Sequence, residues 1–201
     1  MRKFAGLLFL AVMLLQLSGC FAMMAAGATA GVLVAHDRRT TGTIVEDQSI
    51  ELKAFRVLSD MKEILEDSHI SVHSYNNNVL LTGQATNENV RLAVEERISD
   101  ISKIRRIYNE ITIAAPTSLM TRSSDTWIST KLKSQMLVSS DVDPTRVHIT
   151  TEDGVVFLMG IVTPHEEESA VEVARHVRGV KKVVKMFEYL TEDEEISGDL
   201  T

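Results

Sequence analysis

Residues 79–83 read Val-Leu-Leu-Thr-Gly, and residues 156–160 read Val-Phe-Leu-Met-Gly. Each run is apolar, fits a buried strand and ends at a glycine. Each also follows a shorter alternating run, Ile70-Ser71-Val72 in the first case and Val147-His148-Ile149 in the second. The same pattern therefore occurs twice at a constant offset, which predicts two copies of one structural unit.

The residues around each strand pair extend the repeat. The intervening turns, Asn76-Asn77-Asn78 and Glu152-Asp153-Gly154, contain residue types that accept turn geometry. A helical apolar period follows each glycine and precedes each hairpin, and a last strand closes each copy. The expected helices are near Ile50–Asp67, 90–101, Asp125–Val138 and 170–177, and the expected last strands are Ile107–Ile113 and Val183–Tyr189. We expect an α+β fold with two tandem αββαβ units, each a small mixed sheet with two helices packed on one face.

Changes in composition and linker-forming residues divide the rest of the chain into segments. Only one linker signal, rich in Pro, Thr and Ser, lies between the two copies. The expected segments are a signal peptide at 1–19, a lipidated cysteine and membrane-proximal tether at 20–46, a first domain at 47–115, a linker at 116–124, a second domain at 125–192 and an acidic tail at 193–201.

The N-terminus has the form of an export signal. Arg2 and Lys3 precede an apolar run over residues 4–15, which is too short for a membrane span. Leu17-Ser18-Gly19-Cys20 resembles a bacterial lipobox, in which the cysteine becomes the acylated first residue. The alternative is an ordinary signal peptide with a cysteine close to its cleavage site. Phe21 follows the cysteine where an aspartate resembles an inner-membrane retention signal, so we expect sorting to the outer membrane.

The composition excludes several classes of function. The net charge of −7 argues against a nucleic-acid binder, and a single cysteine excludes a disulfide framework or a thiolate zinc site. The six histidines are expected to be scattered and solvent-facing, with His69 and His73 not required to share a face. No nucleophile elbow or comparable catalytic motif occurs in the sequence. We therefore expect a protein that is not an enzyme, with no metal and no cofactor.

The helix expected at Asp125–Val138 contains the only tryptophan of the chain. At about 100° per residue, Ile128, Leu132 and Met136 form a core stripe, and Trp127 lies about 140° from its centre. Trp127 is therefore predicted to point away from the core of its own unit. It could pack against the first unit, be a partly exposed aromatic, or enter a membrane interface, and helix geometry leaves all three open.

The arrangement resembles the BON domain, an αββαβ module of bacterial envelope proteins. The resemblance covers about residues 47–192 and depends on the Val-x-Leu-x-Gly form at Val79–Gly83 and Val156–Gly160. Arg178-Gly179-Val180 before the last strand adds to it, whereas the first copy has Ser102-Lys103-Ile104 and no glycine there.

A lipobox followed by two such domains resembles a group of outer-membrane lipoproteins that support membrane integrity. This resemblance implies that the first helix of the second domain binds anionic phospholipids such as phosphatidylglycerol and cardiolipin. It also implies links to the division site and to the outer-membrane protein assembly machinery. The positions implied to meet phospholipid are Trp127, Thr130, Lys131, Ser134, Leu137 and Val138. The alternative is a protein-interaction adaptor whose lipid contact is incidental.

Overall fold

The computed structural model describes residues 37–139 and 141–190 of the chain. Cys20, the expected signal peptide and the acidic tail lie outside these residues, as does the expected tether up to residue 36. The predictions made for those segments stay predictions.

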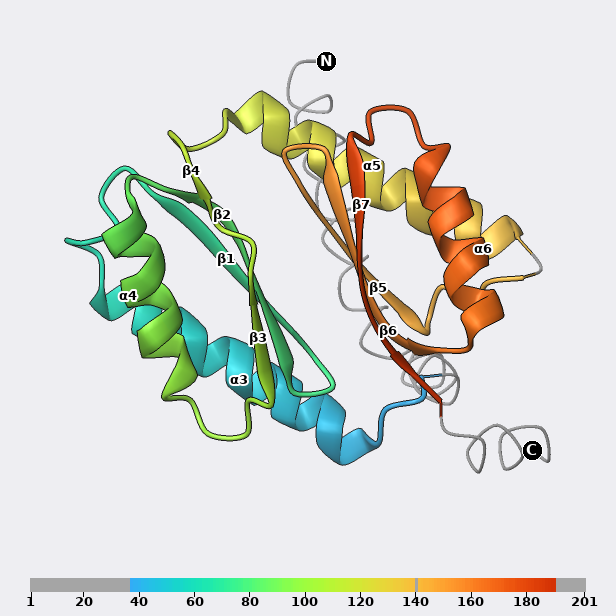
Figure 1. Ribbon diagram of the computed structural model, residues 1–201, viewed down its shortest axis with the longest axis horizontal. Coiled ribbons are helices and arrows are strands. Elements are labelled where there is room, and N and C mark those ends of the chain that lie inside the picture. The colour runs from blue at the N-terminus through green and yellow to red at the C-terminus, as the bar shows by residue number, and fades with distance from the viewer. Residues whose placement is uncertain (1–36, 140, 191–201) are drawn as a thin grey trace, which may run out of the picture. The chain divides into compact units, whose positions relative to one another are not determined.

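The first unit contains two long segments of helix and a small mixed sheet (Figure 1). Its elements are α3 (Thr41–Asp60), β1 (His69–Tyr75), β2 (Asn78–Ala85), α4 (Glu88–Ser99), β3 (Arg106–Asn109) and β4 (Thr112–Ile113). Strand β2 is central, because it pairs antiparallel with β1 and parallel with both β3 and β4.

The second unit repeats this order with one continuous last strand (Figure 1). Its elements are α5 (Leu119–Val138), β5 (Val147–Glu152), β6 (Val155–Val162), α6 (Pro164–Arg175) and β7 (Lys182–Tyr189). Strand β6 pairs antiparallel with β5 and parallel with β7. The predicted α+β class and the αββαβ order of both units are confirmed.

Several boundaries differ from the predicted ones, three of them for a local reason. Helix α3 begins at Thr41 and α5 at Leu119, because the hydroxyls of Thr40 and Ser118 cap the helices by accepting from backbone N–H groups. The expected tether is therefore helical from Thr41, α3 ends at Asp60 and not at Asp67, and the expected linker is helical from Leu119. The last strand of the first unit breaks after Asn109, whose side-chain oxygen accepts from the Ile111 N–H at 3.2 Å.

Both hairpins close through two-residue turns in which both residues have positive φ. The values are 51° and 62° at Asn76 and Asn77, and 46° and 75° at Asp153 and Gly154. This is the turn whose twist matches that of paired strands, and Asn, Asp and Gly are the residues that adopt it most easily. The predicted turns therefore lie where the residue types indicate.

Alternation along the central strands divides the core into three parts. In β2, Val79 and Leu81 face the helices of their own unit, and in β6 Val156 and Leu158 do the same. The intervening side chains form one cluster that joins the two units: Tyr75, Leu80, Phe157, Met159 and Met186. Each sheet therefore has helices on one face and packs its other face against the sheet of the other unit.

Candidate functional site: helix α5 and the contacts that position it

Helix α5 is fixed to its sheet by the predicted apolar stripe. Ile128, Leu132 and Met136 are at most 1% exposed and belong to the core of the second unit. Side chains at this spacing lie on one side of a helix, so the opposite side of α5 is left to solvent.

A buried carboxylate ties α5 to the β5–β6 turn. Asp125 is 6% exposed, and its two oxygens accept from the backbone N–H groups of Asp153 and Gly154 at 2.9 and 2.8 Å. Both donors lie in the positive-φ turn, whose N–H groups would otherwise have no strand partner. Asp125 therefore sets the position of α5 relative to the hairpin.

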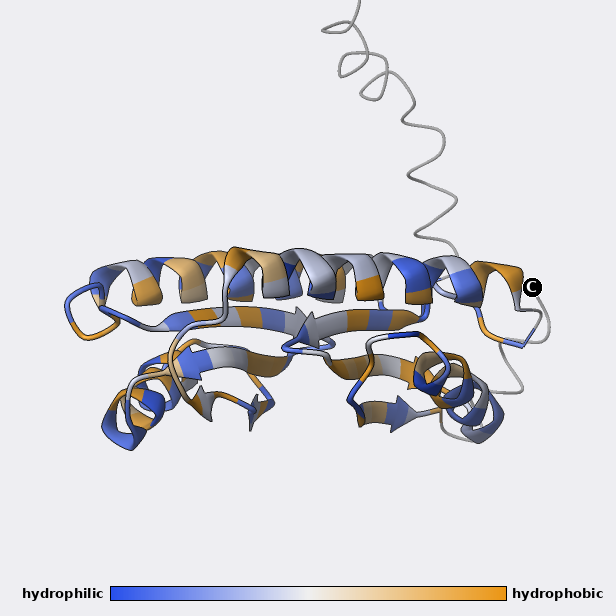
Figure 2. Cartoon of the chain, turned by 90° about the horizontal axis from the view of Figure 1, so that it is seen from above, coloured by the Kyte–Doolittle hydropathy of each residue, from blue (hydrophilic) through white to orange (hydrophobic). Residues whose placement is uncertain are grey.

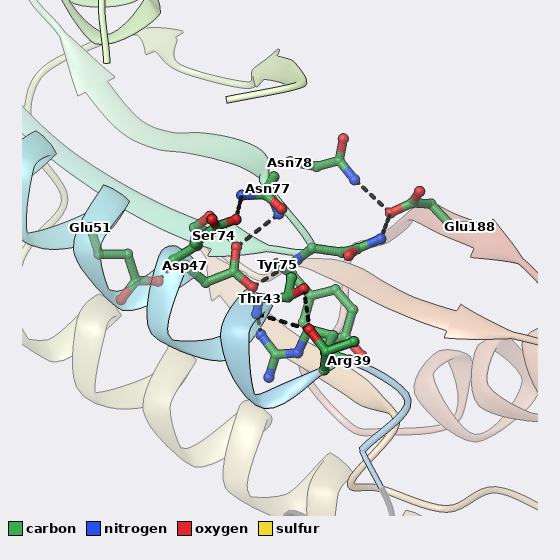
Figure 3. Close-up of polar contacts among 12 residues, drawn as sticks. Arg39, Thr43, Asp47, Glu51, Ser74, Tyr75, Asn77, Asn78 and Glu188 are labelled. Atoms are coloured by element: carbon green, nitrogen blue, oxygen red, sulfur yellow. Dashed lines mark hydrogen bonds and ion pairs between the residues drawn. The ribbon is translucent and has the colours of Figure 1, made fainter. Parts of the chain in front are cut away.

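The first unit has the same contact, which is drawn in Figure 3. Asp47 of α3 accepts from the backbone N–H groups of Asn76 and Asn77 at 2.8 Å each, and from the Ser74 hydroxyl at 2.7 Å. Arg39 also donates to Asp47, at 2.9 Å. Sequence reasoning missed this pair of carboxylates. The signal available was an aspartate three residues before a buried isoleucine in the first helix of each copy.

The exposed side of α5 carries large apolar side chains. Trp127 is 52% exposed, and Leu137 and Val138 are 68% and 88% exposed. Trp127 thus points away from the core, as helix geometry predicts, and it is absent from the cluster that joins the two sheets. Leu119 and Met120, in the first turn of the helix, are exposed as well. Packing of Trp127 into the first unit is therefore not what the structure shows.

The hydroxyl groups on this side are already hydrogen-bonded to the helix itself. Thr130 donates to the carbonyl of Thr126 and Ser134 donates to the carbonyl of Thr130, each at 2.8 Å. A hydroxyl bonded in this way keeps no free donor, which lowers the cost of moving it into a less polar environment. The exposed side of α5 is therefore less polar than its composition indicates.

Two lysines lie on the same exposed surface. Lys131 and Lys133 are both exposed, and neither forms a salt bridge with any residue that the structure describes. Their charges are available to an external anion. None of the described helices is both long enough and apolar enough to cross a bilayer.

A groove of about 370 Å³ separates one edge of α5 from β1 of the first unit. It is lined by His69 and His73 of β1, His148 of β5, and Thr126 and Thr130 of α5. The expectation of scattered, solvent-facing histidines is wrong for this group, and His69 and His73 do share a face. The reason is that residues two and four apart in a strand point to the same side.

Two of these imidazoles are packed between the units. The His73 and His148 ring centroids are 5.8 Å apart. Burial, together with the nearby His73, Arg39 and Lys133, lowers the pKa of His148 to about 4. Within residues 37–139 and 141–190, no three metal-ligating side chains are placed to hold an ion.

Polar contacts also join the two units. Glu188 of β7 accepts from the side-chain amides of Asn76 and Asn78 at 2.8 and 2.7 Å, as Figure 3 shows, and it pairs with Arg105. Gln84 donates to Glu152 at 2.8 Å. These residues position one unit against the other and were not recognised from the sequence.

Two acidic residues, Glu166 and Glu167, lie in the first turn of α6. Glu166 forms a capping box with Thr163 and pairs with Arg38 and Arg146. Its role is therefore structural.

Comparison with known proteins agrees with the repeated fold. The model of the BON domain matches residues 46–115 and 124–191. The chain belongs to the BON domain family. It contains two BON domains, which we call BON1 and BON2 below.

Known proteins match this chain along most of their own length. Outer membrane lipoprotein DolP of Haemophilus influenzae is 36% identical over 174 residues, covering 87% of this chain and 90% of that protein. The 21 kDa hemolysin of Actinobacillus pleuropneumoniae is 38% identical, covering 77% and 79%. A solved structure of CdsD, a structural protein of the type III secretion system of Chlamydia trachomatis, matches with 10% identity over 72% of this chain and 98% of that one. Its TM-score of 0.32 is too low to bear on function.

Proposed function

We propose that the chain is an outer-membrane lipoprotein that faces the periplasm and binds anionic phospholipid through the exposed side of α5. Acylated Cys20 would hold it in the membrane, and BON2 would select where in the membrane it resides. The observation that carries the proposal is Trp127, half exposed on a helix side that also presents Leu137, Val138 and Lys131. The similarity to outer membrane lipoprotein DolP supports the location.

The two contacts would contribute different parts of the affinity. Acyl chains supply about 0.8 kcal/mol per buried CH₂, which gives residence without selectivity. A lysine near an anionic surface adds about 1 kcal/mol, and tryptophan prefers the interfacial region because its ring is apolar and its N–H is a donor. Phosphatidylglycerol and cardiolipin are the anionic lipids we propose as ligands.

Vesicle flotation of residues 37–201 tests the lipid contact without an acyl chain. We expect this fragment to float with vesicles that contain phosphatidylglycerol or cardiolipin, and not with phosphatidylethanolamine alone. Trp127→Glu should abolish flotation, whereas Leu92→Glu, at an apolar position of α4 that is 49% exposed, should not. Binding should also weaken as salt rises, because headgroup attraction is screened. Flotation that survives Trp127→Glu would refute the assignment of the site.

The proposed cellular role is support of outer-membrane integrity, with enrichment at the division site. Binding to the outer-membrane protein assembly machinery is the alternative, in which α5 docks on a protein. A protein contact made through Trp127 would persist in high salt and would need no lipid. The expectation that the chain is not an enzyme and uses no cofactor stays a prediction.

A further inference from the structure

Helix α3 of BON1 has an exposed apolar ridge of its own. Val45, Leu52 and Phe55 are 60%, 54% and 68% exposed. At 100° per residue the three lie within an arc of about 80° on the helix. The buried residues of α3, Ile50 and Ala54, lie on the opposite side. These three side chains therefore share one exposed side of α3, with the polar Gln48 among them.

Cations and carboxylates both lie beside this ridge, and most of the carboxylates already have partners. The carboxylates of this part of α3 are all engaged on the strand-facing side. Glu46 contacts Lys103 and Asn77, Glu51 accepts from the Ser74 N–H, and Asp47 forms the turn contact described above. The exposed charged residues from Lys53 to the end of α3 are Lys53, Arg56 and Asp60. Neither Lys53 nor Arg56 forms a salt bridge among the described residues.

The ridge is not a copy of the exposed side of α5. The equivalent turn contacts align Asp47 with Asp125, and this places Ser49 where BON2 has Trp127. The same alignment places Leu52 where BON2 has Thr130. The apolar residues of α3 therefore occupy other positions, and the repeat does not account for them.

We propose that the α3 ridge, with Lys53 and Arg56, is a second surface that contacts an anionic lipid bilayer. The inference rests on the proposed function, which brings the chain to a membrane. An apolar ridge with two unpaired exposed cations beside it, in a chain whose net charge is −7, is complementary to anionic headgroups around an apolar interior.

The position of α3 in the chain favours a lipid surface over a soluble partner. The helix begins at Thr41, so the segment after Cys20 spans at most about 70 Å even when fully extended. An acylated Cys20 would keep α3 within that distance of the bilayer. Seen from above in Figure 2, the two longest helices, α3 and α5, also lie along the same side of the strands.

Quenching by nitroxide-labelled lipid tests each helix separately in the full acylated chain. The chain has one cysteine, so once Cys20 is acylated a Gln48→Cys substitution provides a single thiol on the ridge side of α3. A fluorophore at this position reports on α3, the same fluorophore at Glu96→Cys on α4 is the matched control, and Trp127 reports on α5. The probe is a vesicle of phosphatidylethanolamine with phosphatidylglycerol, with and without the nitroxide lipid.

We expect loss of fluorescence at the α3 label and none at the α4 label. Phe55→Glu should reduce the quenching at the α3 label and weaken contact about tenfold, because it removes a large apolar side chain and adds a repelled charge. Leu92→Glu should leave the quenching unchanged. Quenching of Trp127 without quenching of the α3 label would overturn this inference and leave the α5 proposal standing. Absence of quenching at both would overturn both, and quenching at the α3 label alone would refute only the α5 proposal.

Discussion

Acidification should weaken the folded chain through His148. The ring is largely buried between the two domains, close to His73 and within the field of Arg39 and Lys133, and its Nε2 atom has no hydrogen-bond partner. Burial and these cationic neighbours lower the pKa of His148 from 6.5 to about 4, while Asp47 opposes the shift. A proton on His148 would thus be placed where water cannot solvate it.

The sign and size of the effect follow from proton binding. Between about pH 6.5 and pH 4 the unfolded chain protonates this histidine and the folded chain does not, so the free energy of unfolding falls as the pH falls. Each unit of pKa shift corresponds to about 1.4 kcal/mol, so full acidification through this window should cost roughly 3 kcal/mol. Above the pKa that His148 has in the unfolded chain, neither state binds this proton, and the folded chain keeps its full stability.

Urea unfolding at about pH 7 and about pH 4.5 measures this difference. His148→Phe removes the titration and the unpartnered nitrogen while keeping an aromatic ring, so its loss of stability on acidification should be smaller by about 2 kcal/mol. Carboxylates that titrate near pH 4.5 act in both proteins and cancel in the comparison. His176→Gln, at an exposed ring, is the control and should behave like the unsubstituted chain. An equal loss of stability in His148→Phe and in the unsubstituted chain would refute the reasoning.

Three further substitutions test the contacts and backbone conformations that hold the two domains in their fold. Asp125→Ala removes two charge-assisted hydrogen bonds and should lower the free energy of unfolding by about 2–4 kcal/mol in urea titration, with Asp125→Asn intermediate. Gly160→Ala would place a methyl group 2.5 Å from the Arg146 carbonyl, so we expect a loss of about 1–3 kcal/mol and a lower Tm by calorimetry. Lys103 has a φ of 79°, so Lys103→Gly should relieve strain and raise stability by about 1 kcal/mol, measured as a shift of the urea midpoint. An unchanged or lower midpoint for Lys103→Gly would contradict this account.

The sequence contained enough information for the elements and their order, because each depends on a local pattern. Alternation gives the strands, a period of 3.6 gives the helices, and turn residues give the hairpins. The helix starts were missed although Thr40 and Ser118 are good capping residues. The reason is that the first turn of each helix is not buried, so the apolar period begins several residues after the helix does. The exposure of Trp127 could be predicted because it needs only the position of the core stripe.

Contacts between the domains could not be predicted in the same way. The contacts of Glu188 with two asparagines and the pairing of His73 with His148 depend on how one sheet docks on the other. Local periodicity carries no information about that docking. Strand β6 is apolar on both faces, which indicates a second buried face but not its partner, and in β2 only Leu80 gives this signal.

The two domains share the residues that hold the fold and differ at those that face outward. Asp47 and Asp125 make the same turn contacts, and Gly83 and Gly160 both allow a backbone carbonyl to approach closely. Even the turn before the last strand keeps its positive φ, although Lys103 takes the place that Gly179 has in BON2. Exposed positions of the first helices are less alike: Lys53 matches Lys131 in the repeat, but Ser49 stands where BON2 has Trp127.

This separation predicts two classes of variant. Changes at the shared positions should alter the free energy of unfolding, and lipid binding should fall only as folded protein is lost. Changes at the exposed apolar positions should alter lipid contact with little effect on unfolding, because those side chains bury little area in the folded chain. If Trp127→Glu lowered the free energy of unfolding as much as Asp125→Ala, the tryptophan would be one of the residues that hold the fold. The proposal that α5 is a binding surface would then be refuted.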